Sequence, residues 1–248
     1  MLIDVHTHLD ALEDIDTILQ RAKEAGVGVI ISNGTNSKTN RITLDLTKKY
    51  PVVKAALGLY PTDALQMTDE QIDEEFDFIR KNKDTIIALG EVGVDYHWIT
   101  DVAQQKKERE NFEKVMAFAE KIKKPIIVHS RKAEVDTVDL LRSSKLKKVV
   151  LHCFGGNMKI AAKAIDAGYW FSIPTNILRD NHFQKLVEML PLKQLLTETD
   201  APYLGPEKNV PNEPANIARS VPIIAKIKSV TKEEMENIIF ANYQRVFL

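Results

Sequence analysis

The sequence predicts an α/β fold and, within that class, a (β/α)8 TIM barrel made of a single domain. Apolar runs alternate with amphipathic segments along the whole chain, which is typical of parallel strands joined by helices. Eight strand–helix units fit into the 248 residues, a length that α/β barrels routinely reach as one domain. No proline- or glycine-rich linker divides residues 1–248. A doubly wound open sheet is the alternative, but it usually has fewer strands.

The expected elements follow from hydrophobic periodicity and from residues typical of helix ends. Short apolar runs predict strands near residues 2–8, 27–33, 52–58, 86–92, 125–129, 148–152, 169–174 and 195–199. Amphipathic segments predict helices near 14–25, 37–49, 69–82, 102–122, 133–144, 157–167, 180–189, 215–228 and 232–246. Gly26 and Gly168 stand where helices should end, and Thr68 and Thr231 stand where helix N-caps are expected.

Composition narrows the class of protein. Hydrophobic residues make up 44% of the chain, enough for a sizeable core, and the single cysteine excludes an internal disulfide and suits a reducing compartment. No apolar run approaches the ~20 residues of a membrane span, and the N-terminus lacks a basic segment followed by an apolar one. We therefore expect a soluble, cytoplasmic protein. The net charge of −1 argues against coating nucleic acid by bulk electrostatics, but not against an enzyme that binds a few phosphates.

The first expected strand carries two histidines on one face. Val and Ile alternate with polar residues over 2–8, so His6 and His8 project in the same direction. Histidine is the commonest protein ligand for divalent metals, and two imidazoles at this spacing can bind one ion. Alternatively, the two side chains are polar groups near a strand end that satisfy each other or the backbone.

Four further metal-competent side chains stand at the ends of other expected strands: Glu91, His129, His152 and Asp200. In a barrel, the C-terminal ends of all strands surround one opening, where active sites lie. Taken singly, each residue has an ordinary structural explanation, such as a histidine under a helix, a capping aspartate or a glutamate paired with a lysine. Taken together with the first histidine pair, they predict a metal site.

The number of these side chains predicts two divalent ions. A catalytic zinc uses about three protein ligands and leaves one position open, so six ligands exceed the need of one ion. Glu91, on a middle strand, is the natural bridge between two ions about 3.5–4 Å apart, which together would activate a water for hydrolysis. Asp200 could take the proton of that water as well as bind an ion. The mixed His and carboxylate set tolerates Mg, Mn or Zn.

Substrate contacts are expected in the loops at the same end. Arg131 could bind phosphate oxygens, or it could pair with a nearby carboxylate. His97 is a candidate phosphate or supporting contact, whereas His182, inside an expected helix, is interpreted as a surface histidine. The lysine-rich segments 121–124 and 145–148 precede strands and should face the opposite end of the barrel. Several aromatic residues could stack on bases or simply cover the barrel: Tyr60, Tyr96, Trp98 and Tyr203.

These motifs resemble the TatD-like deoxyribonuclease family, metal-dependent hydrolases on a TIM barrel within the amidohydrolase superfamily. The resemblance spans nearly the whole chain and is carried by IDVHTHL (3–9), GLYP (58–61), GEVGVDY (90–96), HSRKA (129–133), HCFGG (152–156), ETDAPYL (198–204) and NEP (212–214). Two positions depart from the family pattern: Gly155 stands where Ser or Thr is usual, and Pro211 stands where arginine is frequent. The second departure removes a possible phosphate contact, but neither affects the metal-competent residues.

The resemblance implies a ligand set and an activity. It implies that His6, His8 and Asp200 hold one ion and that His129 and His152 hold the other, with Glu91 shared. The implied activity is metal-dependent hydrolysis of DNA phosphodiesters, commonly exonucleolytic. We expect Arg131, Tyr96 and His97 to contact substrate, and we expect a monomer with no protein or membrane partner. An amidohydrolase-like hydrolase of small amides, lactones or phosphomonoesters is the alternative, and a barrel that only binds metal is a third possibility.

Overall fold

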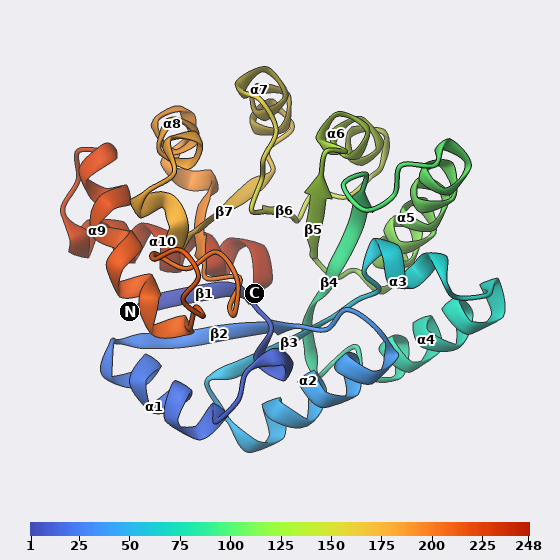
Figure 1. Ribbon diagram of the computed structural model, residues 1–248, viewed down its shortest axis with the longest axis horizontal. Helices are drawn as coiled ribbons and strands as arrows, with labels where there is room; N and C mark the ends of the chain where they lie inside the picture. Colours follow the sequence, from blue (N-terminus) through green and yellow to red (C-terminus); the bar gives the residue numbers. More distant parts are fainter.

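A computed structural model describes all residues 1–248 and contains eight parallel strands whose spatial order is their order in the sequence. Helices form a ring outside the strands (Figure 1). The prediction of a single TIM barrel is confirmed. The strands are β1 (Leu2–Thr7), β2 (Val27–Asn33), β3 (Val53–Leu57), β4 (Ile86–Asp95), β5 (Ile126–Arg131), β6 (Val149–His152), β7 (Trp170–Pro174) and β8 (Leu195–Glu198).

The long helices lie where the amphipathic pattern predicts them. They are α1 (Ile15–Glu24), α2 (Ser37–Lys49), α4 (Asp69–Lys81), α5 (Val102–Ile122), α6 (Glu134–Ser143), α7 (Met158–Asp166), α8 (Asn181–Met189), α9 (Ile217–Ile227) and α10 (Lys232–Phe247). Thr68 and Thr231 each begin a helix with a capping box, and Gly26 and Gly168 follow helix ends with φ of +86° and +84°. No helix combines the length and the apolar character that a membrane span needs.

Most of the short helical segments were not expected from the sequence, although residues 215–216 of the last one fall within the helix expected near 215–228. They are α3 (Pro61–Leu65) and the 3-10 turns η1 (Leu9–Ala11), η2 (Thr175–Leu178), η3 (Leu192–Gln194) and η4 (Pro214–Asn216). Each is too short to show an amphipathic period, and α3 begins at a proline, which a helix accepts in its first turn. Three of them, α3, η1 and η2, follow strands and lie among the loops at the C-terminal end of the barrel.

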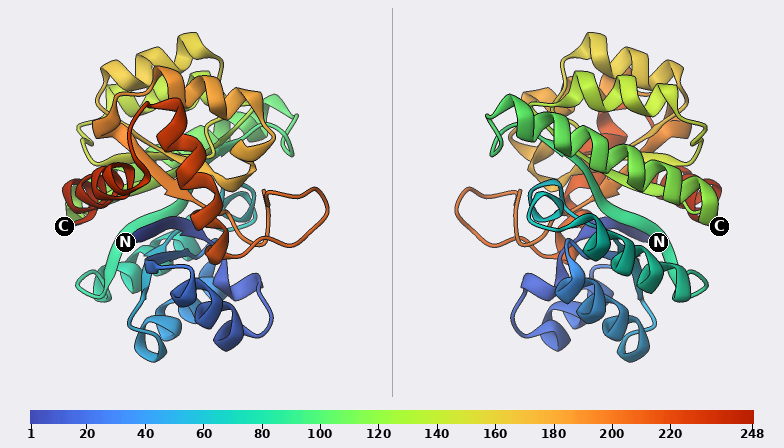
Figure 2. Two further views of the ribbon diagram at one scale, coloured as in Figure 1. Left: turned by 90° about the vertical axis from the view of Figure 1, so that its left-hand side faces the viewer. Right: turned by 90° about the vertical axis from the view of Figure 1, so that its right-hand side faces the viewer.

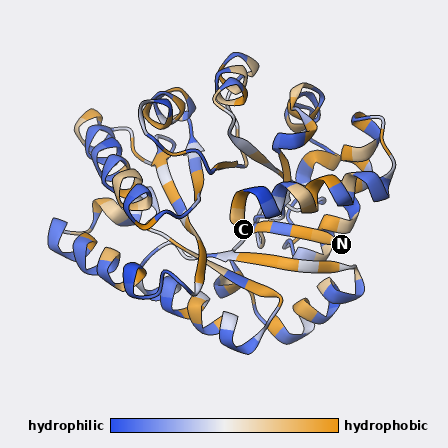
Figure 3. Cartoon of the chain, turned by 180° about the vertical axis from the view of Figure 1, so that it is seen from behind, coloured by the Kyte–Doolittle hydropathy of each residue, from blue (hydrophilic) through white to orange (hydrophobic).

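The core is continuous from the barrel interior to the inner faces of the helices. One cluster of 60 buried hydrophobic residues spans all eight strands and most helices. In Figure 3 the strands are mostly coloured hydrophobic, whereas the helices alternate between hydrophobic and hydrophilic stripes. Strands of a parallel sheet are covered on both faces, so they appear in the sequence as near-continuous apolar runs.

The first and last strands meet without a regular ladder, and individual hydrogen bonds close the barrel there. At the C-terminal end, the Asp200 amide donates to the His6 carbonyl at 2.8 Å, and the His8 amide donates to the Ala201 carbonyl at 2.8 Å. Further along the same seam, the Thr197 hydroxyl donates to a β1 carbonyl at 2.6 Å. This closure holds His6 in β1 and His8, the residue after the strand, beside Asp200.

Candidate metal centre and its cavity

The structure brings all six metal-competent side chains together inside the C-terminal opening of the barrel. They come from β1 and the residue after it, from β4, β5 and β6, and from the loop that follows β8. Five are buried and His129 is partly buried. The residues are His6, His8, Glu91, His129, His152 and Asp200.

Glu91 lies inside its strand, not at the end that the sequence predicts for it. Strand β4 continues for four residues to Asp95, and between Leu89 and Val92 it has one residue more than β5. This bulge places the Glu91 side chain in the opening. Gly93 allows β5 to approach closely, because it has φ of +149° and a Cβ there would lie 2.0 Å from the His129 carbonyl oxygen.

One oxygen of Glu91 faces the first pair of histidines, beside Asp200. Glu91 Oε2 lies 3.5 Å from His6 Nε2 and 3.3 Å from His8 Nε2. Asp200 Oδ1 lies 3.5 and 3.4 Å from the same two nitrogens, which are 3.3 Å apart. Ligands of a tetrahedral ion with bonds of about 2.0–2.1 Å are separated by about 3.3–3.4 Å. The ligand atoms of His6, His8 and Asp200 all lie within 4.8 Å of one another and therefore fit one divalent ion, and Glu91 Oε2 lies beside both imidazole nitrogens.

The other oxygen of Glu91 faces a second group. Glu91 Oε1 lies 2.7 Å from His129 Nδ1 and 3.0 Å from His152 Nε2, and these two nitrogens are 3.2 Å apart. Three potential ligand atoms would leave one tetrahedral position for water or substrate. The two oxygens of one carboxylate thus point to different histidine pairs, as a bridging ligand requires.

Burial and mutual contact set the ionisation of these groups. Burial alone would raise the pKa of Glu91, but the charge of His152 and hydrogen bonds from the surrounding histidines hold it well below its usual range. Burial alone would also raise the pKa of Asp200, but a hydrogen bond from His8 and the charge of the nearby imidazoles lower it. Burial lowers the pKa of His6 to about 4. Ionised carboxylates and the neutral His6 imidazole are in the forms that bind a cation. Burial alone would lower the pKa of His8, His129 and His152, but the neighbouring carboxylates raise it, so these imidazoles must lose a proton when an ion binds.

A cavity of about 830 Å³ opens above this group. Arg131 lies at its rim with its guanidinium 5.6 Å from the Trp98 ring centroid. Trp98 and Tyr203 also line the cavity, with 63% and 59% of their surfaces exposed. Other lining residues had no signal in the sequence, because they come from separate loops and helix starts: Asp10, Asp63, Glu134 and Asp180.

His182, which the sequence analysis interprets as a surface histidine, is partly buried and borders the cavity. It stands near the beginning of α8, lines the cavity, and its Nε2 lies 3.0 Å from the Phe154 carbonyl oxygen. The helical pattern indicates which residues share a face, but not that this face at the start of α8 borders the opening.

Tyr96 and His97 do not line the cavity. The Tyr96 hydroxyl donates to Asp136 at 2.6 Å and accepts from Arg109 at 2.6 Å, outside the barrel opening. His97 packs edge-on against Trp98, with ring centroids 4.6 Å apart. Of the three residues expected to contact substrate, only Arg131 therefore reaches the cavity.

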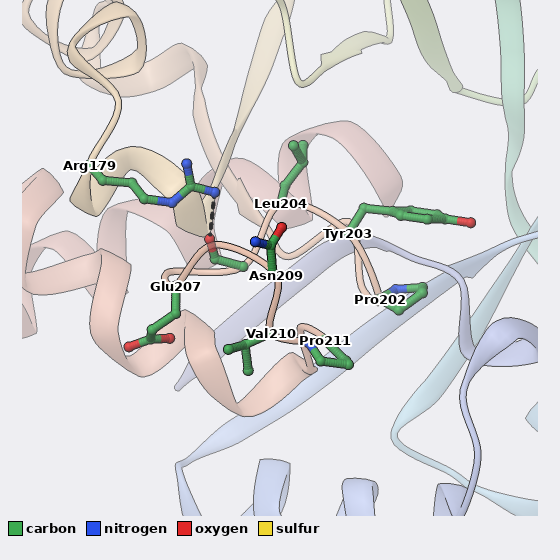
Figure 4. A pocket seen from close by; sticks show the side chains of 9 residues that line it. Arg179, Pro202, Tyr203, Leu204, Glu207, Asn209, Val210 and Pro211 are labelled. Carbon is green, nitrogen blue, oxygen red and sulfur yellow. Dashed lines mark hydrogen bonds between the residues drawn. The ribbon is translucent and has the colours of Figure 1, made fainter.

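A shallow cleft of about 350 Å³ adjoins the main cavity and shares Tyr203 and Leu204 with it (Figure 4). The cleft is formed by the loop after β8, which stands out from the barrel in Figure 2. Arg179 supports this loop by donating to the carbonyl of Gly205 at 3.1 Å. Pro211, one of the two departures from the family pattern, lines this cleft and not the metal group.

Comparison with known proteins identifies relatives over the whole chain. Deoxyribonuclease TATDN3 from Homo sapiens is 35% identical over 258 residues, covering 99% of this chain and 94% of the relative. A metal-dependent hydrolase from Methanocaldococcus jannaschii is 34% identical, covering 99% and 96%. Among solved structures, the TatD homologue YJJV from Escherichia coli K12 superposes with a TM-score of 0.91 at 26% identity, covering 99% of this chain and 97% of that one.

The sequence and the fold therefore indicate the same protein family. The family described as TatD related DNase matches residues 3–248, nearly the full length. The barrel architecture matches that of the solved TatD homologue, which is similar along its whole length. This chain belongs to the TatD-related DNase family of metal-dependent hydrolases.

Proposed function

We propose that this protein hydrolyses phosphodiester bonds of DNA, starting from a strand end, with two divalent metal ions. The observation that supports the proposal most directly is the placement of Glu91. Its oxygens face two different histidine pairs at 2.7–3.5 Å, so one carboxylate can serve two ions. Membership in a family of metal-dependent deoxyribonucleases supports the choice of reaction.

In this proposal the six residues divide into two ligand sets around a shared carboxylate. His6, His8 and Asp200 hold the first ion, His129 and His152 hold the second, and Glu91 belongs to both. Bound divalent ions lower the pKa of water and offset the negative charge on the oxygens of a phosphodiester. Magnesium, manganese and zinc all accept nitrogen and carboxylate ligands of this kind.

Asp200 has a second role as the base that receives a proton from the attacking water. Hydrogen bonds and nearby imidazoles lower its pKa, so the carboxylate is ionised at neutral pH and can accept a proton. Its side chain keeps 13% exposure toward the cavity, whereas that of Glu91 keeps only 4%. Asp200 is thus the more accessible of the two catalytic carboxylates.

The rim of the cavity supplies contacts for the nucleotide. Arg131 is exposed there and offers a planar guanidinium to phosphate oxygens. Trp98 and Tyr203 present exposed rings that can stack on bases, a contact worth ~1–3 kcal/mol each. These three residues surround the metal group without contributing to it.

A substrate panel with different ions tests the proposal. Metal-stripped protein is assayed with magnesium, manganese or zinc on linear single-stranded DNA, linear duplex, circular single-stranded DNA, p-nitrophenyl phosphoesters, and small amides and lactones. We expect metal-dependent release of nucleotides from linear DNA, and no cleavage of circular DNA, because it has no end. Cleavage of circles would contradict the exonucleolytic mode. Cleavage of amides, lactones or phosphomonoesters without cleavage of DNA would show that DNA is not the substrate.

We also propose that the protein acts as a monomer in the cytoplasm. Its single cysteine, Cys153, forms no disulfide and lines the metal cavity. A free thiol beside a metal site persists most readily in a reducing compartment. Sedimentation velocity of the metal-loaded protein, with a species near 28.1 kDa as the expected result, tests the oligomeric state.

A further inference from the structure

We propose that Asp95 and Glu198 are positioning residues that set the affinity of the second metal ion through the histidines in front of them. This inference rests on the proposed metal centre. Neither carboxylate reaches Glu91 or the open cavity, and neither is one of the six potential ligands. Each lies behind one histidine of the second pair, on the side facing away from Glu91.

Asp95 is fully buried at the end of β4 and is bonded on both oxygens. Its Oδ2 lies 2.9 Å from His129 Nε2 and accepts from the Tyr60 hydroxyl at 2.6 Å. Its Oδ1 accepts from the backbone amides of His97 and Trp98 at 2.8 and 3.3 Å. These four contacts fix the carboxylate, and the fixed carboxylate orients the imidazole.

Glu198, at the end of β8, occupies the equivalent place behind His152. Glu198 Oε1 and His152 Nδ1 are 3.6 Å apart, and both are buried atoms with no hydrogen-bond partner. The other oxygen of Glu198 is held by a hydrogen bond from Ser172. A small rotation of the imidazole closes the remaining gap, so that Nδ1–H donates to Glu198 when Nε2 binds an ion.

The first histidine pair has no such carboxylates. His8 Nδ1 lies 3.0 Å from the Asn33 carbonyl oxygen, and His6 Nδ1 is buried without a partner. The first ion instead has Asp200 as a carboxylate ligand of its own, whereas the second shares only Glu91. We infer that Asp95 and Glu198 supply negative charge to the second ion indirectly, by making its imidazole ligands stronger donors.

The arrangement also fixes which nitrogen of each ring is free to bind. Because Asp95 engages Nε2 of His129, the ion must bind His129 through Nδ1. Because Glu198 faces Nδ1 of His152, the ion must bind His152 through Nε2. The two histidines of one ion are therefore opposite tautomers, and the backing carboxylates impose this difference.

Zinc affinity tests the inference without any measurement of activity. The metal-stripped full-length protein and its variants Asp95→Asn and Glu198→Gln are titrated with zinc in competition with a chromophoric chelator. We expect two ions per chain in the wild type. In each variant, one binding step should weaken by about 10–100-fold while the other stays unchanged.

Glu75→Gln is the matched control. Glu75 is a buried carboxylate that accepts hydrogen bonds from Asn40 and Arg41 but contacts no histidine. Its neutralisation should lower the free energy of unfolding and leave both zinc affinities unchanged. If Asp95→Asn and Glu198→Gln bind both ions like the wild type, or if Glu75→Gln weakens binding equally, the inference is wrong. A wild type that binds fewer than two ions would instead contradict the proposed metal centre, and this inference with it.

Nitrogen-15 NMR of the zinc-loaded wild type provides a second test that needs no variant to fold. We expect His129 to be protonated at Nε2 and metal-bound at Nδ1, with the reverse at His152. Metal binding of His129 through Nε2 would break its contact with Asp95 and would overturn the proposal.

Discussion

The carboxylate of Asp4 accepts two hydrogen bonds from Thr199 and thereby joins the first and last strands of the barrel. The Thr199 amide donates to Oδ1 at 3.0 Å, and its hydroxyl bonds Oδ2 at 2.6 Å. Asp4 is fully buried, and burial raises its pKa to about 8 although these bonds and one from the His6 amide act in the opposite direction. The contact belongs to the same seam as the hydrogen bond from the Asp200 amide to the His6 carbonyl, next to the first three metal-competent residues.

Thr199→Val should destabilise the protein. Valine keeps the shape of threonine but leaves Asp4 Oδ2 buried without its partner, which costs about 1–3 kcal/mol. Urea unfolding of the metal-free protein measures the loss. Thr43→Val is the control, because the Thr43 hydroxyl is buried and has no hydrogen-bond partner, so its removal should be neutral or stabilising. Equal stability of the two variants would show that the seam bond contributes nothing.

Glu91→Ala and Asp200→Asn should differ in the number of ions they retain. In the proposed metal centre, loss of the shared carboxylate removes a ligand from both sets, so Glu91→Ala should bind both ions more weakly. Asp200→Asn should lose only the first ion. Each ion stabilises several kcal/mol of transition-state charge, so both variants should lose about 10³-fold or more in DNA hydrolysis. Elemental analysis after gel filtration counts the ions, and two ions retained by Glu91→Ala would exclude bridging.

Glu108→Gln should change the pH dependence of stability. Glu108 is buried on α5 behind Asp95, and burial raises its pKa from 4.5 to about 7. The folded state therefore favours the protonated carboxyl. The contribution of Glu108 to the free energy of unfolding is fully present below about pH 4.5 and is lost as the pH rises through about 7. Glutamine still accepts from the Asp95 amide but cannot ionise.

We expect Glu108→Gln to match the wild type near pH 5 and to exceed it by on the order of 2 kcal/mol at pH 8. Urea unfolding of the metal-free proteins at both pH values measures the difference. A variant whose advantage is the same at pH 5 and pH 8 would show that Glu108 does not titrate in this range.

Arg131→Ala should weaken DNA binding through loss of a phosphate contact. The slope of log affinity against log salt should fall by about 1, and KM should rise more than kcat falls. Fluorescence anisotropy with labelled DNA over a salt series measures the slope. Lys147→Ala removes the same charge at the opposite end of the barrel, just before β6, and should leave the slope unchanged. Identical slopes for both variants would show that DNA does not bind at the cavity rim beside Arg131.

Local patterns in the sequence were sufficient for most of the architecture. Strand and helix positions follow from runs and periods of apolar residues, and the helix starts at Thr68 and Thr231 follow from capping chemistry that needs only neighbouring residues. The lysine-rich segments 121–124 and 145–148 precede β5 and β6, so they lie away from the metal group as expected. The short segment α3 was missed because five residues show no period.

The side chains around the metal group depend on contacts between distant parts of the chain. Tyr60 and Tyr96 both follow strand ends, yet Tyr60 bonds Asp95 behind a histidine whereas Tyr96 bonds Asp136 outside the opening. His182 reaches the cavity because of where α8 packs. Neither sequence spacing nor residue type distinguishes these outcomes.

The sequence by itself determined the barrel and the residues that gather at its opening, because strand alternation and topology direct them to one end. Only the tertiary structure decided that the two oxygens of Glu91 face different histidine pairs and that Asp95 and Glu198 stand behind the second pair. The physical reason is that these relationships depend on a bulge in β4 and on side-chain distances across neighbouring strands. Differences of an ångström decide them, and no local pattern encodes differences of that size.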